Sequence, residues 1–262
     1  MSTRVAIVTG ASSGIGAATA RGLAEAGLNV LVNYAGNAEG AAKVVAECEA
    51  KGVDAVAVQG DVSDDASCRA IAAAAKDRWG RIDVLINKAG TTKIANAQDL
   101  SALSGDDFQQ IYSVNVVGAY QMTRAAEAAL REGETPAIVN TSSIAGTHGM
   151  GSSIAYMASK GALNTMTLAL ARTFAPQVRV NAVCPGYVAS EWWRDVDAAT
   201  VEKMRARSAS IALLQRVASS EDIAEAVLFF ALGARAVTGQ LLIVDNGMTL
   251  NVGQPASDAQ RA

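Results

Sequence analysis

Residues 4–16 of the chain, RVAIVTGASSGIG, carry the strongest indication of its fold. The apolar, β-branched run at 4–9 predicts a strand buried on both faces. It leads straight into Gly10, Gly14 and Gly16 and then into an alanine-rich, helix-prone segment. Glycines in a strand-to-helix turn let the backbone approach a pyrophosphate, whose charge the helix N-terminus favours. The spacing G-x3-G-x-G differs from G-x-G-x2-G, and an ordinary tight turn is the alternative, but the context favours phosphate binding.

Apolar strands alternate with amphipathic helices along the rest of the chain, which is typical of a doubly wound sheet. We expect a single-domain α/β Rossmann fold over residues 1–250, with a seven-stranded, mostly parallel sheet, helices on both faces and a polar tail at 251–262. Strands are predicted near 4–9, 29–34, 53–59, 82–87, 136–142, 177–183 and 240–245. Helices are predicted near 14–27, 37–51, 64–79, 106–131, 155–175 and 221–232. The segment 186–216 breaks this rhythm and is predicted to form a helical lid over the substrate.

A second indication comes from Ser143, Tyr156 and Lys160. Tyr156 and Lys160 are four residues apart in a predicted helix, so their side chains share one face. A nearby ammonium favours a phenolate, and we therefore expect the Tyr156 pKa to lie below its ordinary value of about 10. Such a phenol can exchange a proton with a substrate oxygen, which Ser143 is positioned to hydrogen-bond. Taken alone, a Tyr-x3-Lys pair is more often a simple helix-surface pair.

Together these motifs resemble the short-chain dehydrogenase/reductase family, in particular its 3-oxoacyl reductases and carbonyl reductases. The matching residues run almost from end to end: Thr9-Gly10-x3-Gly14-Ile15-Gly16, Asp61-Val62, Asn87-Lys88-Ala89-Gly90, Asn115, Ser143, Tyr156-x3-Lys160, Pro185-Gly186 and Val237-Thr238-Gly239-Gln240. Lys88 departs from the family pattern, which usually has a second Asn at this position. The substitution either perturbs the floor of the cofactor site or is tolerated there, and the sequence does not decide between the two.

The resemblance implies an oxidoreductase that interconverts a ketone and a secondary alcohol by hydride transfer. It makes Tyr156 the general acid and base, Ser143 a hydrogen-bond donor to the substrate oxygen, and Lys160 a ligand of the nicotinamide ribose. Asn115 corresponds to the family Asn that holds a water next to Lys160, although a helix-interior Asn bonded to backbone is the commoner interpretation. Substrate contacts are expected from Ser143, Tyr156 and Trp192. Trp193 follows Trp192 directly, so only one of the two is expected to line the site.

The residues expected to bind the cofactor lie mainly at the carboxyl ends of the predicted strands. They are Gly10, Ser12, Ser13, Gly14, Ile15, Gly16, Asn33, Tyr34, Asp61, Val62, Asn87, Ala89, Gly90, Tyr156, Lys160, Pro185, Gly186, Val188 and Ser190. An acidic residue ending the second strand would bind the adenosine ribose and reject a 2′-phosphate. Tyr34, preceded by Asn33, takes that position by similarity. NADP(H) is therefore favoured, with NAD(H) as the alternative.

The amino-acid composition limits the kinds of partner that the protein is expected to bind. The 262 residues carry a net charge of −3 without a basic stripe, which argues against nucleic acid or an anionic membrane. No apolar run reaches the ~18 residues of a membrane span, and residues 1–4 leave no room for a signal peptide. Three widely spaced cysteines and a single histidine, His148, indicate neither a disulfide framework nor a metal site. We expect a cytoplasmic, metal-free enzyme that acts on a small molecule.

The sequence indicates the oligomeric state and the substrate less sharply than it indicates the fold. Small residues in the predicted helices at 106–131 and 155–175 permit close packing, and the resemblance implies a homotetramer, with a dimer as the alternative. Other functions remain open: an NAD-dependent sugar or alcohol dehydrogenase, a non-redox relative such as an epimerase, or a regulatory nucleotide-binding protein, for which Lys88 is the one supporting feature. The substrate could be a 3-oxoacyl thioester, a sugar, a ring ketone or a small ketone.

Overall fold

Strand β1 (Val5–Val8) lies in the middle of the structure because both of its faces are apolar. Ala6 and Val8 pack into one hydrophobic cluster, whereas Val5 and Ile7 pack into the cluster on the opposite face. The computed structural model describes residues 3–194 and 196–251. Within these residues the chain forms one seven-stranded sheet in the order β3-β2-β1-β4-β5-β6-β7, and every pairing in it is parallel.

The remaining strands are β2 (Asn29–Tyr34), β3 (Ala55–Gln59), β4 (Val84–Asn87), β5 (Ala137–Thr141), β6 (Arg179–Pro185) and β7 (Leu241–Val244). The helices are α1 (Gly14–Glu25), α2 (Ala38–Glu49), α3 (Asp65–Trp79), α4 (Gly105–Tyr112), α5 (Ala119–Arg131), α6 (Ala145–His148), α7 (Ile154–Phe174), α8 (Ala198–Ile211) and α9 (Ser220–Leu232). All seven predicted strands and the doubly wound Rossmann architecture are confirmed. The sheet is parallel throughout the described residues, rather than mostly so.

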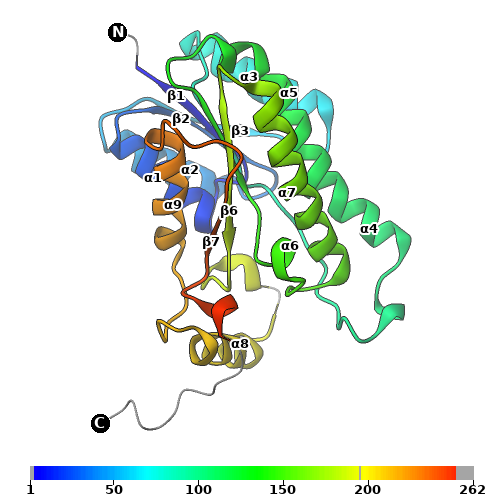
Figure 1. Ribbon diagram of the computed structural model, residues 1–262. Helices are drawn as coiled ribbons and strands as arrows, with labels where there is room; N and C mark the ends of the chain where they lie inside the picture. The colour runs from blue at the N-terminus through cyan, green and yellow to red at the C-terminus, as the bar shows by residue number, and fades with distance from the viewer. Residues whose placement is uncertain (1–2, 195, 252–262) are drawn as a thin grey trace.

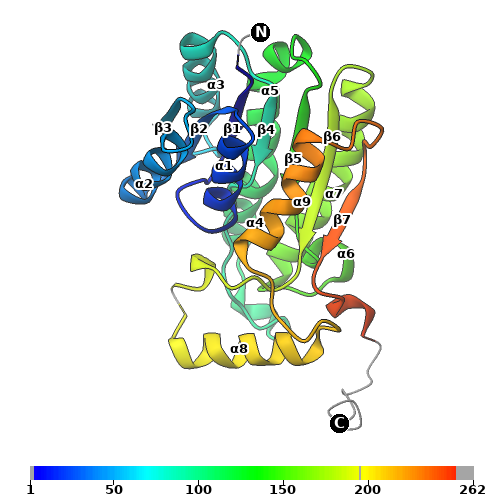
Figure 2. The ribbon, with the colours of Figure 1, turned by 90° about the vertical axis from the view of Figure 1, so that its left-hand side faces the viewer.

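The helices form a layer on each face of the sheet (Figures 1 and 2). Helices α1, α2 and α9 supply the alanine, leucine and valine side chains of one cluster, and α3, α5 and α7 supply those of the other. Parallel strands need such cover on both faces, since their residues are apolar on both sides. The strand order reverses between β1 and β4, and in open parallel sheets the ligand binds at the carboxyl ends of the strands where the order reverses.

The predicted helix at 106–131 is interrupted. It consists of α4, a π-helical stretch at Ser113–Gly118 and α5. Single π-helical turns inside helices are often found at functional sites, because they re-aim a side chain inward. Here the wide turn contains Asn115, whose side chain is buried and bonded to two other segments. The spacing of apolar residues in the sequence does not reveal this π-helical turn, because the turn shifts that spacing by only one residue.

The segment 186–216 is mainly helical. It contains a short 3-10 turn at Glu191–Trp193 followed by α8, which lies across the end of the molecule toward which β6 and β7 run (Figure 2). None of the residues of α8 is buried, so this helix belongs to neither hydrophobic cluster. Of the predicted tail at 251–262, all but Asn251 lies outside the described residues.

Candidate active site

The glycine-rich turn between β1 and α1 is shaped for close backbone contact. Gly10 has a φ of +60°, and a Cβ on Gly16 would stand 2.4 Å from the carbonyl oxygen of Gly10. Ser13 is the N-cap of α1, yet its side chain makes no capping hydrogen bond. The first N–H groups of α1 are therefore available to an anion, which the helix dipole favours as well. The turn fits the diphosphate of a dinucleotide.

Asn33 supports this turn from beneath. Its side-chain oxygen accepts a hydrogen bond from the Gly10 N–H at 3.3 Å, and its amide donates to the carbonyls of Val58 and Gly60. Asn33 is fully buried, so the structure uses its amide to join β1, β2 and β3. Tyr34, the next residue, is partly buried against the cluster on the α1 side of the sheet. Asn33 thus positions the turn, whereas Tyr34 stands where β2 ends.

A pocket of about 320 Å³ lies beside the turn, between α1, α2 and the start of the lid. Ser12, Ser13 and Gly14 line it together with Asn37 and Lys43 of the α2 region. Sequence reasoning missed Lys43, because nothing in the sequence tells which side of α2 faces the turn. An ammonium in this pocket is available to a phosphate near the end of β2.

The loop after β4 closes the other side of the turn. A Cβ on Gly10 would lie 2.9 Å from the Cα of Ala89, so the two loops touch. Asn87 points into the protein and donates to Thr123 and to Asn140 of β5. Gly90 lies next to Lys160, since a Cβ there would be 3.7 Å from the ammonium nitrogen. The loop therefore bridges the glycine-rich turn and the catalytic helix.

Asp61 and Val62 follow β3 at the same edge of the sheet. The Asp61 carboxylate accepts from the Ser63 N–H at 2.9 Å in a short turn, and its side chain is exposed to solvent. Val62 is buried, and a Cβ on Gly118 would lie 2.7 Å from its Cγ2. Val62 thus packs the end of β3 against the π-helical turn.

Ser143, Tyr156 and Lys160 are brought together, although they come from different elements. Ser143 follows β5, and its hydroxyl accepts from the Ala145 N–H at 3.1 Å, donates to the Pro185 carbonyl at 3.4 Å and lies close enough to the Tyr156 phenol to lower its pKa. Lys160 lies one turn after Tyr156 in α7, and its ammonium nitrogen is 5.6 Å from the centre of the Tyr156 ring. That ammonium donates to the Thr141 carbonyl at 2.8 Å. The three side chains therefore form one group at the carboxyl end of β5, with Lys160 buried and Ser143 and Tyr156 partly exposed.

The expected direction of the Tyr156 pKa is wrong for this structure. Burial raises the pKa of the Tyr156 phenol to about 12, and the hydrogen bond with Ser143 lowers it only in part. Burial and, to a smaller extent, the neighbouring Lys88 ammonium lower the pKa of Lys160 to about 8. Desolvation disfavours both charged forms, because neither side chain has a counter-ion close by. The phenol is accordingly protonated at neutral pH.

Asn115 joins two segments of the site. Its side-chain oxygen accepts from the Thr91 N–H at 2.8 Å, and its amide donates to the Thr91 carbonyl and to the Ser159 hydroxyl, each at 3.0 Å. These bonds hold the loop after β4 against α7, one residue before Lys160. The sequence allowed two interpretations of Asn115, an amide bonded to backbone and an amide next to Lys160. The structure combines them, since the Asn115 amide is bonded to the Thr91 backbone and also lies close to Lys160.

The loop after β6 and the start of the lid complete the cleft. The Pro185 carbonyl accepts from the Ile144 N–H at 3.0 Å, and the Gly186 N–H donates to Val244. Ser190 lies over the glycine-rich turn, because a Cβ on Gly14 would be 3.6 Å from the Ser190 Cβ. Val188 is buried and its carbonyl accepts from the Trp193 indole at 3.1 Å.

The two neighbouring tryptophans point to different surroundings. The Trp192 ring lies 6.0 Å from the Tyr156 ring, centre to centre. The Trp193 ring instead stacks on Tyr187 at 5.3 Å, within the lid segment itself. One tryptophan thus faces the catalytic tyrosine and the other packs on the scaffold.

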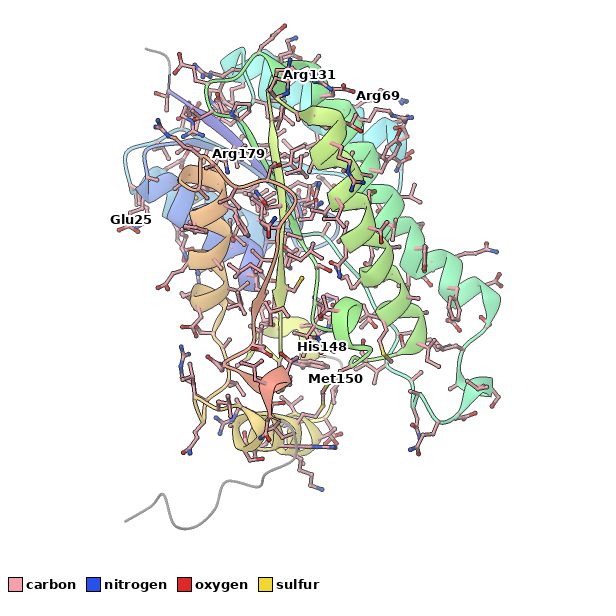
Figure 3. All side chains as sticks on the ribbon, in the orientation of Figure 1. Glu25, Arg69, Arg131, His148, Met150 and Arg179 are labelled. Carbon is pink, nitrogen blue, oxygen red and sulfur yellow. The ribbon has the colours of Figure 1, made fainter. Side chains whose placement is uncertain are left out.

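His148 has no contact with the catalytic group. Its ring nitrogen Nδ1 is 2.8 Å from the Thr147 hydroxyl, and the side chain is exposed. Figure 3 shows His148 and Met150 toward the end of the molecule where α8 lies, with Arg69 and Arg131 at the other end. In the part of the chain that the structure describes, no three or more His, Cys, Asp or Glu side chains gather as a metal site, and no helix is long and apolar enough to cross a membrane.

Comparison with known proteins agrees with this site. Residues 10–249 match a family model described as enoyl-(acyl carrier protein) reductase. A Streptomyces violaceoruber protein assigned as ketoacyl reductase 2 of the granaticin polyketide synthase is 41% identical over 94% of this chain and 96% of its own length. The 3-oxoacyl-acyl-carrier-protein reductase FabG of Staphylococcus aureus is 35% identical over 94% of this chain and 98% of its own. A crystal structure from Burkholderia xenovorans, assigned to the short-chain dehydrogenase/reductases, has a TM-score of 0.88 at 42% identity and covers 95% of this chain and 99% of that one.

The chain belongs to the short-chain dehydrogenase/reductase family. It is therefore an oxidoreductase that acts on a CH–OH or carbonyl group of a small molecule with a nicotinamide nucleotide as cofactor. The glycine-rich turn and the uncapped N-terminus of α1 are the residues that fit this cofactor's diphosphate.

The turn geometry predicts the effect of a single methyl group. Gly16→Ala should weaken binding of the nicotinamide nucleotide at least tenfold, because the new Cβ would push the Gly10 carbonyl out of its position. Dissociation constants from NADPH or NADH fluorescence would measure this loss. Gly105→Ala is the matched control, since a Cβ there meets no atom within 4 Å. Unchanged binding by the Gly16 variant would contradict the proposed role of the turn.

Proposed function

We propose that this protein is an NADP(H)-dependent reductase that converts a ketone to a secondary alcohol, with 3-oxoacyl thioesters as its substrate class. The observation that carries the proposal is that the hydroxyls of Ser143 and Tyr156 lie together beside Lys160, at the sheet edge that also bears the glycine-rich turn. Two hydroxyls that converge beside a buried cation suit an oxygen on which negative charge develops. Such an oxygen arises when a carbonyl carbon accepts a hydride.

The raised pKa of Tyr156 suits the reductive direction. A bound reduced nicotinamide supplies the hydride. Tyr156, with a pKa raised to about 12, keeps its proton at neutral pH and can pass it from the phenol oxygen to the developing alkoxide. Ser143 donates a hydrogen bond to the same oxygen, and this bond strengthens as the charge grows. Lys160, held by the Thr141 carbonyl, adds a positive charge that favours the phenolate left after transfer.

An apolar mouth beside the tyrosine supports an acyl substrate. A Cβ on Gly151 would lie 3.4 Å from the Tyr156 ring, and the Ala95 N–H donates to Ser152, so the 94–95 and 150–152 loops flank the tyrosine together. Ile94 and Met150 in these loops are both exposed. Exposed apolar side chains around a polar reacting centre fit a substrate with a polar carbonyl and an aliphatic chain. The relatives named as 3-oxoacyl and ketoacyl reductases point to the same class.

The assignment as a ketone reductase is tested with a matched pair of thioesters. The protein should consume NADPH with a 3-oxoacyl thioester and not with the 2-enoyl thioester of the same chain length, because Ser143 and Tyr156 are arranged to hold an oxygen at the reacting carbon. Tyr156→Phe should lower kcat at least 1000-fold with the dissociation constant for NADPH within about threefold of wild type. Near-normal turnover by this variant would sink the mechanism, and reduction of the enoyl thioester alone would reject the substrate class.

The preference for NADP(H) rests on the lack of a carboxylate at the end of β2. Tyr34 and Asn33 are uncharged, and Lys43 lines the pocket beyond them. Glutamates also line this pocket, but Arg21 pairs with Glu47 and Glu221, and Lys43 supplies a further cation for a 2′-phosphate. Binding of a dianionic phosphate next to an ammonium is favourable in this partly enclosed pocket.

Tyr34→Asp should reverse the preference. A carboxylate at this position repels the 2′-phosphate and bonds the free 2′-hydroxyl, so the NADPH:NADH ratio of kcat/KM should fall at least tenfold, which corresponds to ~1.4 kcal/mol. Tyr34→Phe keeps the ring without a new charge and serves as the control. A wild type that strongly prefers NADH would refute the proposed cofactor, and an unmoved ratio would refute the role of position 34.

We also propose a homotetramer. Two apolar surfaces are exposed: Phe229 of α9 with Leu242 and Ile243 of the edge strand β7, and Val117 with Tyr120 near the start of α5. A tetramer with two-fold axes needs two separate self-complementary faces. Two of the small residues in the long helices face the inside of the chain instead, because Gly118 packs on Val62 and Gly161 faces Gly146.

The mass in solution tests this assembly. At micromolar concentration the protein should have four times the mass of the 26.8 kDa chain. Phe229→Glu should reduce it to a dimer, because it charges one of the two apolar surfaces, whereas Glu225→Gln on the same helix should not. A monomeric wild type would contradict the proposal.

A further inference from the structure

A chain of four buried polar side chains connects helices α5 and α7 through the sheet. Asn87 of β4 and Asn140 of β5 are paired in the sheet register, and their side chains are bonded to each other. Thr123 of α5 and Thr167 of α7 stand at the two ends of the chain. None of the four residues exposes more than 4% of its surface. A polar network with so little water around it holds its members in a defined geometry, because broken bonds would not be replaced by solvent.

The direction of the hydrogen bonds in this chain is fixed. The Asn87 amide donates to Thr123 Oγ1 at 3.2 Å and to Asn140 Oδ1 at 3.0 Å. The Asn140 amide donates to Thr167 Oγ1 at 2.9 Å. Each threonine hydroxyl gives its own proton to the carbonyl four residues earlier in its helix, at 2.8 Å in both cases. Since a hydroxyl has a single proton, each threonine can only accept from the asparagine that faces it.

The bond between Asn140 and Thr167 attaches α7 to β5 at a distance from the reacting groups. A second attachment lies at the site itself, where the Ser142 hydroxyl donates to the Lys160 carbonyl at 3.2 Å. Thr167 follows Lys160 by seven residues of α7, which is two helical turns or about 10 Å. Apolar contacts have no direction and let a helix slide along a strand or turn about its axis. Two directed bonds at separated points prevent both movements.

The relative position of the reacting hydroxyls depends on this attachment. Tyr156 and Lys160 belong to α7, whereas Ser143 follows β5, three residues after Asn140. A shift of α7 along β5 would therefore move the Tyr156 phenol relative to the Ser143 hydroxyl. Reacting groups tolerate little such movement, since a misplacement of about 1 Å can lower a rate on the order of a hundredfold.

We propose that Asn140 and Thr167 are positioning residues of the active site, because their hydrogen bond sets where α7 lies along β5 and thereby the distance between the hydroxyls of Tyr156 and Ser143. Both act through the backbone, from the buried layer between the sheet and α7. The inference rests on the roles of Ser143 and Tyr156 in the proposed function.

The test removes one hydroxyl from each end of the chain. Thr167→Val keeps the shape of the side chain and takes away the acceptor of Asn140. Thr123→Val is the matched control, because Thr123 is also buried, accepts from an asparagine and donates within its own helix, but lies on α5. Both variants should lower the melting temperature by similar amounts. Only Thr167→Val should lower kcat for ketone reduction, at least about tenfold, with the KM for the ketone within about threefold of wild type.

Rescue by a conservative variant separates positioning from a loosened core. Thr167→Ser keeps the hydroxyl and should return kcat to within about twofold of wild type. An equal fall of kcat in Thr123→Val, a normal kcat in folded Thr167→Val or a failure of Thr167→Ser to restore kcat would overturn the proposal. Where Thr167→Val does not fold, Thr167→Cys takes its place under the same criteria, because a thiol is a weak acceptor.

Crystal structures of the variants distinguish this inference from the proposed function. In Thr167→Val, α7 should be displaced along β5 by about 0.5 Å or more, a shift that Thr123→Val should not show. An unmoved α7 would overturn the proposal, also if kcat fell. A displaced α7 in a protein that reduces no ketone would support the positioning by Asn140 and Thr167 and reject the proposed function alone.

Discussion

The hydroxyl of Thr9 joins the two loops on which the whole site depends. It donates to the Ile86 carbonyl at 3.2 Å and accepts from the N–H groups of Lys88 and Ala89, each at 3.0 Å. Through these bonds the end of β1 is attached to the end of β4, where the strand order reverses. The glycine-rich turn then starts at a defined distance from the loop that carries Lys88 and Gly90. A buried hydroxyl with all of its bonds made is rigid, which suits a residue that sets a distance.

Charge in the cleft follows from burial. Tyr156, Lys160 and Lys88 all lose water on folding, and each is shifted toward its neutral form. The Coulomb effect of a single nearby cation on a phenol is smaller here than the cost of burying a phenolate, which is why the i,i+4 spacing alone predicted the wrong direction. The site in this form holds a proton on the tyrosine and a surplus of positive charge without a bound counter-ion. Both properties suit an enzyme that binds an anionic cofactor and protonates an oxygen.

Buried polar side chains hold the backbone segments of the site together. Asn33 holds the glycine-rich turn, Asn115 holds the loop after β4 to α7, and Asn87 connects β4 to β5. Buried amides can donate and accept at once, so one side chain joins two segments that are far apart in sequence. The Ser143 hydroxyl is likewise bonded to backbone, since it accepts from the Ala145 N–H and donates to the Pro185 carbonyl. The geometry of the site consequently depends on strands β1 to β5 and on helix α7.

The sequence by itself determined the strands and the two helical layers and pointed to Ser143, Tyr156 and Lys160 as one group, because apolar periodicity and i,i+4 spacing are local properties. Boundaries agreed to within one or two residues for most elements, as for β2 and α3. What only the tertiary structure decided concerns groups whose neighbours come from distant segments. The wide π-helical turn at Asn115 and the side of α2 that presents Lys43 are of this kind. The direction of the Tyr156 pKa and the approach of Lys88 to Lys160 belong with them, since desolvation and charge depend on distances in space that residue spacing does not contain.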